Sequence, residues 1–467
     1  LIRCAPHGFH AVQTFHDLHP VLQRLAEQAG GQAVGKAGVA AQHGHAVKVG
    51  GGEQGVRVDQ VVVALAVHHV VALVVAAGHK VMIGVTGTKG KTTTTHMIRA
   101  ILLAAGKKVG MIGTTGTVIG DVVTPTLNTT PESYELHQAF AQMVEAGCEY
   151  AVMEVSSQGI KMHRTDGLYF NYAIFTNISP DHIGPGEHAD FEEYLYYKTR
   201  LLNMCGIGLV NKDDEHAPQI IKAANCELYT YSEESKEADF VASDIRYVSQ
   251  PDFVGTEFHI SGKYDMEVRL GIPGLFNVVN ALAAVSVCSF LGLDQARISH
   301  ALENIRVNGR MEIVYTSERC TVLVDYAHNA VSMESLLSTL RDYKPKRLVC
   351  VFGCGGNRSK DRRYSMGEIG GKMADLSIIT ADNSRYEKVE DIIADIRGSI
   401  EKTGGKFIEI PDRREAIRYS ILHAQPGDMV AVIGKGHEDY QEINGVRHHF
   451  LDREVIEETV KELGEKA

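Results

Sequence analysis

The stretch that decides the fold is VMIGVTGTKGKTTTTHMIRAILLAAG, residues 81–106. Its apolar start, residues 81–85, predicts a buried strand, and a helical pattern begins near Thr92. Between them lies a turn made of Gly, Thr and Lys. A strand, a glycine turn and a helix in this order are typical of a phosphate-binding loop, because backbone N–H groups and the positive end of the helix dipole converge on an anion.

The turn also supplies the side chains that such a loop needs. We expect Lys91 to reach the terminal phosphates of a nucleotide and the Thr92 hydroxyl to hold Mg²⁺. The usual pattern has glycine five residues before the GK pair, but Val85 stands there, and Gly87 gives the form T-G-T-K-G-K-T instead. A purely structural glycine turn is the alternative, and the strand–GK-T–helix context argues against it. The predicted nucleotide-binding residues of this loop are Gly87, Thr88, Lys89, Gly90, Lys91, Thr92 and Thr93.

Composition sets wide limits on the function. The chain has 467 residues, 44% hydrophobic and 22% charged, which is ordinary for a globular protein of two to four domains. Its net charge of -11 argues against nucleic acid and anionic membranes as partners. The eight cysteines show no CxxC spacing, which predicts reduced thiols in a cytoplasmic protein. The apolar segment 61–77 has His68 and His69 at its centre, so we do not predict a membrane span.

Three regions of the sequence differ in composition and in their pattern of strand and helix signals. Residues 1–80 hold nine of the 22 histidines and only four acidic residues, and we predict an atypical, poorly ordered segment. Residues 81–305 alternate strand and helix signals, which predicts a central α/β domain with a parallel sheet around the phosphate loop (a P-loop ATPase domain). Residues 306–467 alternate again and predict a Rossmann-like α/β domain. Four of its strands end in polar loops, which should meet at one edge of the sheet.

Polar residues also follow two strands of the central region. Glu154 ends the strand in AVMEVSSQG, where it could contact Mg²⁺ directly or through another group, or could be a solvated strand end. Asp181 and His182 follow another strand in FTNISPDHIGPGEH. A phosphate loop with these neighbours does not by itself separate a switch GTPase from a ligase.

The order of motifs resembles the Mur ligases. The sequence carries TGTKGKT, NTTPE, MEVSSQG, TNISPDH, LVNKDDEHA, GLFNVVNALAA, VNGRME, VDYAHNA, GCGGNRSKDRR, ADNSR and GKGHE in that family's order, over roughly residues 81–467. The resemblance is greatest to the members that add the third amino acid of the peptidoglycan stem. Residues 1–80 do not resemble the family's N-terminal uridine-binding domain.

The resemblance implies an ATP-dependent ligase. The γ-phosphoryl group of ATP would pass to the D-Glu carboxylate of UDP-MurNAc-L-Ala-D-Glu, and an amine would then attack the acyl phosphate. Lys91 and Thr92 would serve the phosphates and a first Mg²⁺, with Glu154 on the same metal. His182 would serve a second Mg²⁺. Lys198 matches the lysine that CO₂ carbamylates, although from the residues alone it would be an exposed helix lysine.

Further site residues are carried over by position. The UDP substrate would contact Thr129, Thr130, Ser156 and Arg164. Adenine would face Asn277, while Arg310, Asp325, His328 and Asn329 would contact ribose and phosphates, which implies domain closure during turnover. The amino acid would contact Arg363, Asp382, Asn383, Arg385, Gly434 and Glu438. The chain departs from the family pattern at Gln158, Met162 and Ser384, and in the loop HIGPGEH, which has two extra residues.

The loop DNSR indicates which amino acid is added. Its Asn383 and Arg385 match the ligases for meso-diaminopimelate, whose far carboxylate a guanidinium can grip through two parallel hydrogen bonds. L-lysine is the second choice, since Arg385 would repel its ammonium. Alternatively, Arg385 pairs with Glu387 or another acid and never meets substrate.

Three other functions stay open at this point. Folylpolyglutamate synthetase shares the central architecture but lacks the last three motifs in this form. A phosphate-loop switch or transport ATPase would not need the polar strand ends of residues 306–467. A noncatalytic paralogue is the third, because residues 1–80 are unusual. We expect a cytoplasmic monomer without a nucleic-acid or membrane partner.

Overall fold

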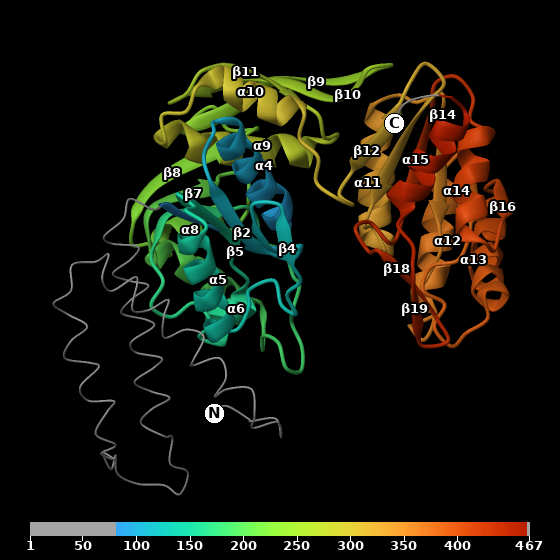
Figure 1. Cartoon of the computed structure of the whole chain (residues 1–467), viewed down its shortest axis with the longest axis horizontal. Helices are drawn as coiled ribbons and strands as arrows, with labels where there is room; N and C mark the ends of the chain where they lie inside the picture. The colour runs from blue at the N-terminus through green and yellow to red at the C-terminus, as the bar shows by residue number, and fades with distance from the viewer. Residues whose placement is uncertain (1–80, 465–467) are drawn as a thin grey trace, which may run out of the picture. The chain divides into compact units, whose positions relative to one another are not determined.

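The structure is a computed structural model that describes residues 81–464 (Figure 1). The predictions for residues 1–80, including segment 61–77, lie outside the described residues. Two compact units are present: one holds residues 81–95, 106–210 and 214–229, and the other holds residues 96–105, 211–213 and 230–464. Within residues 81–464, no helix combines the length and the apolar character that crossing a membrane requires.

An eleven-stranded sheet is built around β1 (Val81–Thr86), in the order β11-β10-β9-β8-β7-β6-β1-β5-β2-β3-β4. The other strands are β2 (Val109–Gly113), β3 (Gly116–Ile119), β4 (Val122–Thr124), β5 (Tyr150–Glu154), β6 (Phe170–Phe175), β7 (Cys205–Asn211), β8 (Glu227–Ser232), β9 (Phe240–Gln250), β10 (Phe253–Gly262) and β11 (Met266–Leu270). The expected parallel sheet is confirmed, since β1 pairs in parallel with β5 and β6. Antiparallel strands extend it at both edges, with β3 and β4 at one and β10 and β11 at the other.

The helices of this region connect the strands. They are α4 (Lys91–Ala104), α5 (Ser133–Glu145), α6 (Ser157–Lys161), α7 (Phe191–Thr199), α8 (Ala217–Ala223), α9 (Leu275–Phe290) and α10 (Gln295–Glu303), with a 3₁₀ turn, η1 (Arg200–Asn203), directly after α7. Asp190 caps α7, because its carboxylate accepts a hydrogen bond from the Glu193 N–H at 2.8 Å. Apolar side chains occupy most positions of α9, and 11 of its 16 residues are accordingly buried.

The second sheet has six strands in the order β12-β13-β17-β14-β15-β16. They are β12 (Glu312–Thr316), β13 (Cys320–Asp325), β14 (Arg347–Phe352), β15 (Leu376–Ile379), β16 (Phe407–Glu409) and β17 (Asp428–Ile433). The neighbouring strands of this sheet pair in parallel, except that β12 pairs antiparallel with β13. Because helices cover both faces, strands such as β17 read as unbroken apolar runs.

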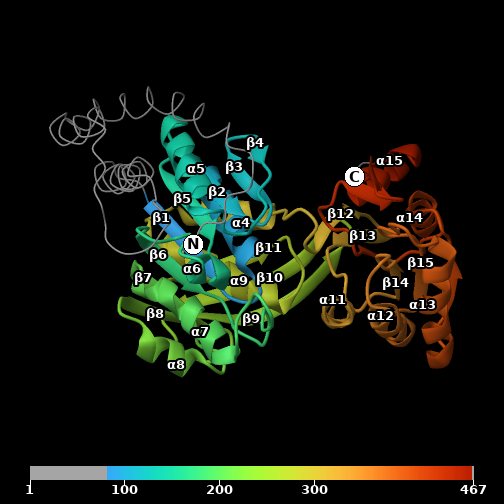
Figure 2. The ribbon, with the colours of Figure 1, turned by 90° about the horizontal axis from the view of Figure 1, so that it is seen from below.

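Helices lie on both sides of this sheet. Figure 2 shows α11 (Ala330–Asp342), α12 (Asp361–Met373) and α13 (Val389–Thr403) on one side, and α14 (Arg413–Leu422) and α15 (Asp452–Glu462) on the other. A two-stranded hairpin, β18 (Tyr440–Ile443) and β19 (Val446–His449), follows β17. The predicted α/β layering is therefore confirmed, while the hairpin was not predicted.

The described cysteines are all free thiols, and six of the seven are buried. For the cysteines within residues 81–464, the prediction of buried, reduced thiols is confirmed.

Candidate active site

The phosphate loop lies at the centre of the large sheet, where β1 ends between β5 and β6. Val85 pairs with Glu154 and Thr86 pairs with Phe175, so the ends of both neighbouring strands flank the loop. The Thr88 N–H donates to the Asn177 carbonyl at 2.8 Å, and the Lys89 N–H donates to Asn177 Oδ1 at 2.9 Å. Asn177, in the segment after β6, therefore holds the phosphate loop in place by accepting hydrogen bonds from two backbone N–H groups of the loop.

Gly87 shows why glycine is required here. Its φ is +147°, and a Cβ at this position would collide with Thr176 Oγ1. That hydroxyl donates to the Lys89 carbonyl at 2.7 Å, so it cannot move aside without releasing the loop. Gly90 also lies in the left-handed region, at φ +85°. Both glycines of the predicted motif thus serve the loop conformation.

Two lysines meet at the Gly87 carbonyl. Lys91 Nζ donates to this oxygen at 2.8 Å, and Lys198 Nζ donates to it at 2.7 Å. Lys198 is only 2% exposed, so the alternative of an exposed helix lysine is wrong. Burial, together with the neighbouring Lys91 ammonium, holds the pKa of Lys198 well below its usual value.

Tyr194 connects Lys198 to the loop. Its ring lies 4.6 Å from Lys198 Nζ, and its hydroxyl is 3.1 Å from Thr88 Oγ1. Burial raises the pKa of the Tyr194 phenol to about 12, so the ring carries a neutral hydroxyl at physiological pH. Helix α7 therefore presents a cation and a hydrogen-bonding ring to the phosphate loop.

Glu154 is a buried carboxylate and not a solvated strand end, since it is 1% exposed. Its two oxygens accept the Thr92 hydroxyl, each at 3.0 Å, and one accepts the Thr114 N–H at 2.8 Å. A hydroxyl and a carboxylate in contact are the oxygen donors that Mg²⁺ prefers, and this ion usually takes its other ligands from water and phosphates. The pair fits the predicted metal, although within residues 81–464 no three His, Cys, Asp or Glu side chains form a metal-binding group.

His182 lies in the loop with two extra residues. It has a left-handed backbone (φ +53°), its side chain is 51% exposed, and its Nδ1 is 3.0 Å from Glu187 Oε1. The loop closes on itself through the His188 N–H, which donates to the His182 carbonyl at 3.0 Å. His188 is fully buried, its ring centroid lies 5.2 Å from that of Tyr194, and burial lowers its pKa. The unusual loop thus packs against the same tyrosine as Lys198.

The residues predicted for the UDP substrate gather beside Glu154. The Thr130 hydroxyl donates to the Glu154 carbonyl at 3.0 Å and accepts the Ser156 N–H at 2.9 Å. Arg164 Nη1 donates to the Thr130 carbonyl at 3.2 Å, and Thr129 Oγ1 is 3.1 Å from Thr114 Oγ1. Thr130 is wholly buried, so its contacts within the protein support the turn between β5 and α6.

In the smaller sheet the four polar strand ends do meet at one edge, as predicted. Asp325 at the end of β13 pairs with Ile433 at the end of β17, and Phe352 of β14 pairs with Ile379 of β15. The loops that follow bring Asn383 against Glu438, with Nδ2 donating to Oε2 at 3.0 Å. Gly434, at φ +113°, passes so close to Asp382 that a Cβ there would lie 2.7 Å from the carboxylate.

Arg385 contacts Glu442, which is an acid other than the Glu387 that we named, and it also binds a backbone carbonyl. Its Nε is 3.5 Å from Glu442 Oε2, and its Nη1 donates to the Gly356 carbonyl at 2.7 Å. The proposed alternative partner, Glu387, pairs instead with Arg363 at 2.8 Å. The Arg385 side chain stays 23% exposed, so a ligand can still reach it.

Arg363, unlike Arg385, is a buried side chain whose guanidinium binds two carboxylates. It is 1% exposed, and its guanidinium also binds Asp395 at 2.9 Å. Two carboxylates therefore engage this side chain, an arrangement that supports the start of α12 rather than an open pocket.

The predicted nucleotide contacts near β13 form a group of their own. Asp325 accepts the Met311 N–H at 2.8 Å, and burial raises its pKa. The Arg310 guanidinium lies 4.9 Å from the Tyr326 ring, and His328 Nδ1 is 2.8 Å from the Tyr326 carbonyl. Asn329 caps α11 by accepting the Ser332 N–H at 2.9 Å.

Asn277, the residue predicted to face adenine, lies in α9. It is 2% exposed, and its amide donates to the Pro273 carbonyl at 2.7 Å.

Comparison with known proteins identifies the family. The Mur ligase middle domain matches residues 85–288, and the Mur ligase glutamate ligase domain matches residues 309–436. A UDP-N-acetylmuramoyl-L-alanyl-D-glutamate--2,6-diaminopimelate ligase of Caldanaerobacter subterraneus is 40% identical, over 82% of this chain and 78% of the relative. The chain belongs to the Mur ligase family. Mur ligases are ATP-dependent ligases that use Mg²⁺, and the switch and transport ATPases are thereby excluded.

Two further relatives agree with this assignment. A 2,6-diaminopimelate ligase of Clostridium tetani is 41% identical over 82% of this chain and 78% of its own length. The solved structure of a 2,6-diaminopimelate ligase is 32% identical, has a TM-score of 0.69, and covers 90% of this chain and 86% of its own. A folylpolyglutamate synthase from Thermotoga maritima has 17% identity and a TM-score of 0.60, so it shares the fold alone.

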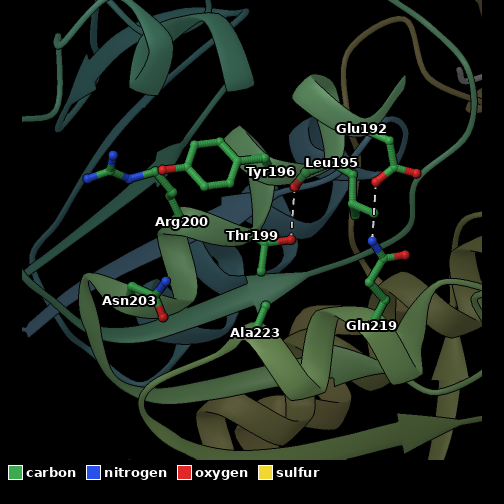
Figure 3. Close-up of a pocket in the computed structure, with 8 residues that line it drawn as sticks. All are labelled: Glu192, Leu195, Tyr196, Thr199, Arg200, Asn203, Gln219 and Ala223. Atoms are coloured by element: carbon green, nitrogen blue, oxygen red, sulfur yellow. Dashed lines mark hydrogen bonds between the residues drawn. The ribbon is translucent and has the colours of Figure 1, made fainter. Parts of the chain in front are cut away.

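A hollow of about 260 Å³ lies beside this Mur ligase's α7, away from the residues described above. It is lined by Glu192, Leu195, Tyr196, Thr199, Arg200, Asn203, Gln219 and Ala223 (Figure 3). The lining residues of α7 recur at helical spacing on one face, whereas Tyr194 and Lys198 occupy another. The lining includes none of the residues predicted from the sequence.

Two buried cationic residues, one arginine and one lysine, were not predicted from the sequence. Arg413 is fully buried and binds Asp452 at 2.7 Å, while its Nη1 and Nη2 donate to the Ala381 and Ile433 carbonyls at 3.2 and 3.0 Å. Those carbonyls immediately precede the two loops that carry the predicted amino-acid contacts. Lys435, inside the GKGHE motif, is also fully buried. Only the motif itself could have drawn attention to Lys435, and nothing local in the sequence marks Arg413.

Proposed function

We propose that this Mur ligase joins 2,6-diaminopimelate to UDP-N-acetylmuramoyl-L-alanyl-D-glutamate with hydrolysis of ATP to ADP, in peptidoglycan synthesis. The similar proteins named above support the substrates. One observation supports the amino acid: a guanidinium and a carboxylate lie in one hydrogen-bonded group. Asn383 binds Glu438 through its Nδ2 and Glu442 N–H through its Oδ1 at 2.9 Å, and Glu442 binds Arg385. The far end of meso-diaminopimelate carries the complementary ammonium and carboxylate.

The phosphate loop performs the first half of the reaction. Its N–H groups and the Lys91 ammonium hold the phosphates of ATP, so that charge developing during phosphoryl transfer is neutralised without rearrangement. Thr92 and Glu154 would hold Mg²⁺, which screens the phosphate oxygens when bound. His182 is assigned to a second Mg²⁺, and the Glu187 contact at Nδ1 would leave Nε2 for the ion.

Lys198 is proposed to carry a carbamate. Its depressed pKa raises the fraction of neutral amine, the form that can attack CO₂ to form the N–C bond and release one proton. The product is an anion beside the Lys91 ammonium, since both lysines meet at the Gly87 carbonyl. Carbamylation therefore replaces a group that Lys91 repels in its protonated form by one that Lys91 attracts.

The remaining assignments belong to the same proposal. Domains at 81–305 and 306–467 would supply the two groups of nucleotide contacts, with Asn277 facing adenine and Arg310, Asp325, His328 and Asn329 facing ribose and phosphates. Thr129, Thr130, Ser156 and Arg164 would lie near the UDP substrate. A monomeric state stays a prediction.

L-lysine is the second candidate for the added amino acid. The Arg385–Glu442 contact favours it, because a neighbouring carboxylate offsets the guanidinium charge that would repel a lysine ammonium.

The test measures phosphate release with ATP, UDP-MurNAc-L-Ala-D-Glu and a panel of amino acids. We expect the highest kcat/KM with meso-diaminopimelate. Arg385→Ala should lower that value about 10- to 100-fold, since a hydrogen bond to a charged group contributes roughly 1.5–3 kcal/mol. Arg397→Ala is the matched control, because the partly exposed Arg397 of α13 pairs with Glu409 of β16. A wild-type preference for L-lysine, or equal selectivity in Arg385→Ala, would show the assignment to be wrong.

A further inference from the structure

Lys435 is a buried cation inside the group that is proposed to bind the amino acid. It follows Gly434 at the end of β17 and is 0% exposed. Its Nζ lies 3.3 Å from Asn383 Oδ1 and 3.3 Å from Glu438 Oε2, with the Tyr440 ring centroid 5.2 Å away. Because the ammonium is enclosed, it touches other residues of the protein and not a ligand.

The first consequence concerns the direction of the Asn383 amide. Oδ1 faces two groups that can only donate, the Lys435 ammonium and the Glu442 N–H at 2.9 Å. Nδ2 faces Glu438, which can only accept when ionised. The opposite amide orientation would direct N–H groups against an ammonium, so the lysine fixes Asn383 with its NH₂ toward the carboxylate.

The second consequence concerns charge. The carboxylates of Asp382, Glu438 and Glu442 lie in this group, and Arg385 and Lys435 are the cations in contact with Glu442 and Glu438. The Arg413 guanidinium also attracts Asp382 and Glu438, but its own ion pair is with Asp452. Loss of Lys435 would remove the cation that contacts Glu438 and make the group more negative by one charge. That change disfavours a ligand end that carries a carboxylate and favours one that carries only an ammonium.

We propose that Lys435 is a positioning residue for amino-acid selection: it orients Asn383 and balances Glu438, and so favours a diamino acid with a second carboxylate over L-lysine. This inference rests on the proposed function. It assigns Lys435 no contact with ATP and no part in the chemical step.

The test compares wild type, Lys435→Met, Glu438→Gln and the double variant by steady-state kinetics with meso-diaminopimelate and L-lysine. Methionine keeps the length of the buried stem but removes the charge. We expect Lys435→Met to raise KM for meso-diaminopimelate about tenfold or more, to lower the ratio of the two kcat/KM values by a similar factor, and to change KM for ATP less than about twofold. Lys372→Met is the control, because Lys372 pairs with Glu368 on the exposed face of α12.

The double variant separates positioning from general damage. If Lys435 acts through Glu438, Lys435→Met should change the selectivity less than about threefold when Glu438→Gln is already present. If Lys435→Met does not fold, a folded double variant with the selectivity of Glu438→Gln supports the proposal, and one with a further tenfold loss overturns it. Unchanged KM and selectivity in a folded Lys435→Met also overturn it.

Failure of the proposed function would look different. If wild type ignores meso-diaminopimelate and adds another amino acid, that function is wrong, and KM for the amino acid it does add decides the role of Lys435. A tenfold rise in that KM in Lys435→Met retains the positioning role, whereas an equal KM removes it.

Discussion

Replacing Lys198 by methionine should stabilise the protein while abolishing ligation. The Lys198 side chain is buried, and its Nζ donates a hydrogen bond to the Gly87 carbonyl, which Lys91 also binds. Methionine would keep the apolar stem against Tyr194 and remove the charge. Gly87 would keep the Lys91 hydrogen bond, so no buried carbonyl would be left unpaired.

The magnitude follows from opposing terms. The lost hydrogen bond to a charged donor contributes about 1.5–3 kcal/mol, while taking an ammonium out of water costs several kcal/mol. Removing the repulsion from Lys91 adds to the gain, so Lys198→Met should be more stable by roughly 1–3 kcal/mol. Alanine would also lose three buried methylenes, roughly 2.4 kcal/mol at about 0.8 kcal/mol each, so Lys198→Ala should gain little or nothing.

The pH dependence has a definite sign. The pKa of Lys198 is depressed in the folded protein, so at pH values between the folded and unfolded pKa the unfolded chain binds more protons at this position than the folded chain. Wild-type stability at this site therefore rises with pH between the folded and unfolded pKa values. The advantage of Lys198→Met should shrink accordingly and be gone above about pH 10.5, the ordinary lysine range.

The assay is thermal unfolding in CO₂-depleted buffer, followed by the same measurement with bicarbonate. One kcal/mol corresponds to about 2–4 °C for a domain of 150–250 residues. Bicarbonate should narrow the gap, because carbamylation removes the buried ammonium from wild type only. The reasoning is refuted if Lys198→Met unfolds at a lower temperature than wild type in CO₂-depleted buffer near neutral pH, or if it still ligates at a normal rate.

Two other variants test the site and its support. Lys91→Ala should lower kcat about 10²- to 10³-fold with little change in unfolding temperature, because it removes one preorganised cation from the phosphates; near-normal phosphate release by the folded variant would contradict this. Arg413→Met should destabilise the protein by about 3–5 kcal/mol, since it leaves the Asp452 carboxylate buried without its partner. The double change Arg413→Met/Asp452→Leu should recover most of that loss in urea unfolding, and equal stability of the single and double variants would rule the argument out.

Much of the fold could be predicted from local patterns. Strand β1 and helix α4 lie where the apolar pattern indicated them, and β5 and β6 lie directly before the polar residues that we expected at strand ends. The position of the site at the strand ends followed as well, because polar residues came directly after buried strands. The antiparallel edges of the large sheet and the β18–β19 hairpin did not follow, since pairing at an edge depends on distant strands.

The partners of charged side chains were the least predictable part. Sequence spacing made Glu387 the nearest acid to Arg385, yet tertiary packing gives Glu387 to Arg363 and Glu442 to Arg385. For the same reason the burial of Lys198 was not predicted from its neighbours in the sequence. Its helix, α7, has no strong apolar face that would indicate which residues are buried. Burial of a charge is decided by what surrounds it in three dimensions, and the sequence alone does not list those neighbours.

Hydrogen bonds fix the backbone of the loop that carries Asn383 and Arg385 both at its start and at Arg385. Arg413 binds the carbonyl just before it, and at its tip the Arg385 N–H donates to the Glu442 carbonyl at 3.0 Å while the Arg385 carbonyl accepts the Asn444 N–H at 2.6 Å. A backbone held in this way gives evolution little freedom to redirect the loop. A descendant of this enzyme that adds a different amino acid would therefore keep the backbone conformation of the loop. Its new specificity would come from substitutions at a few side chains.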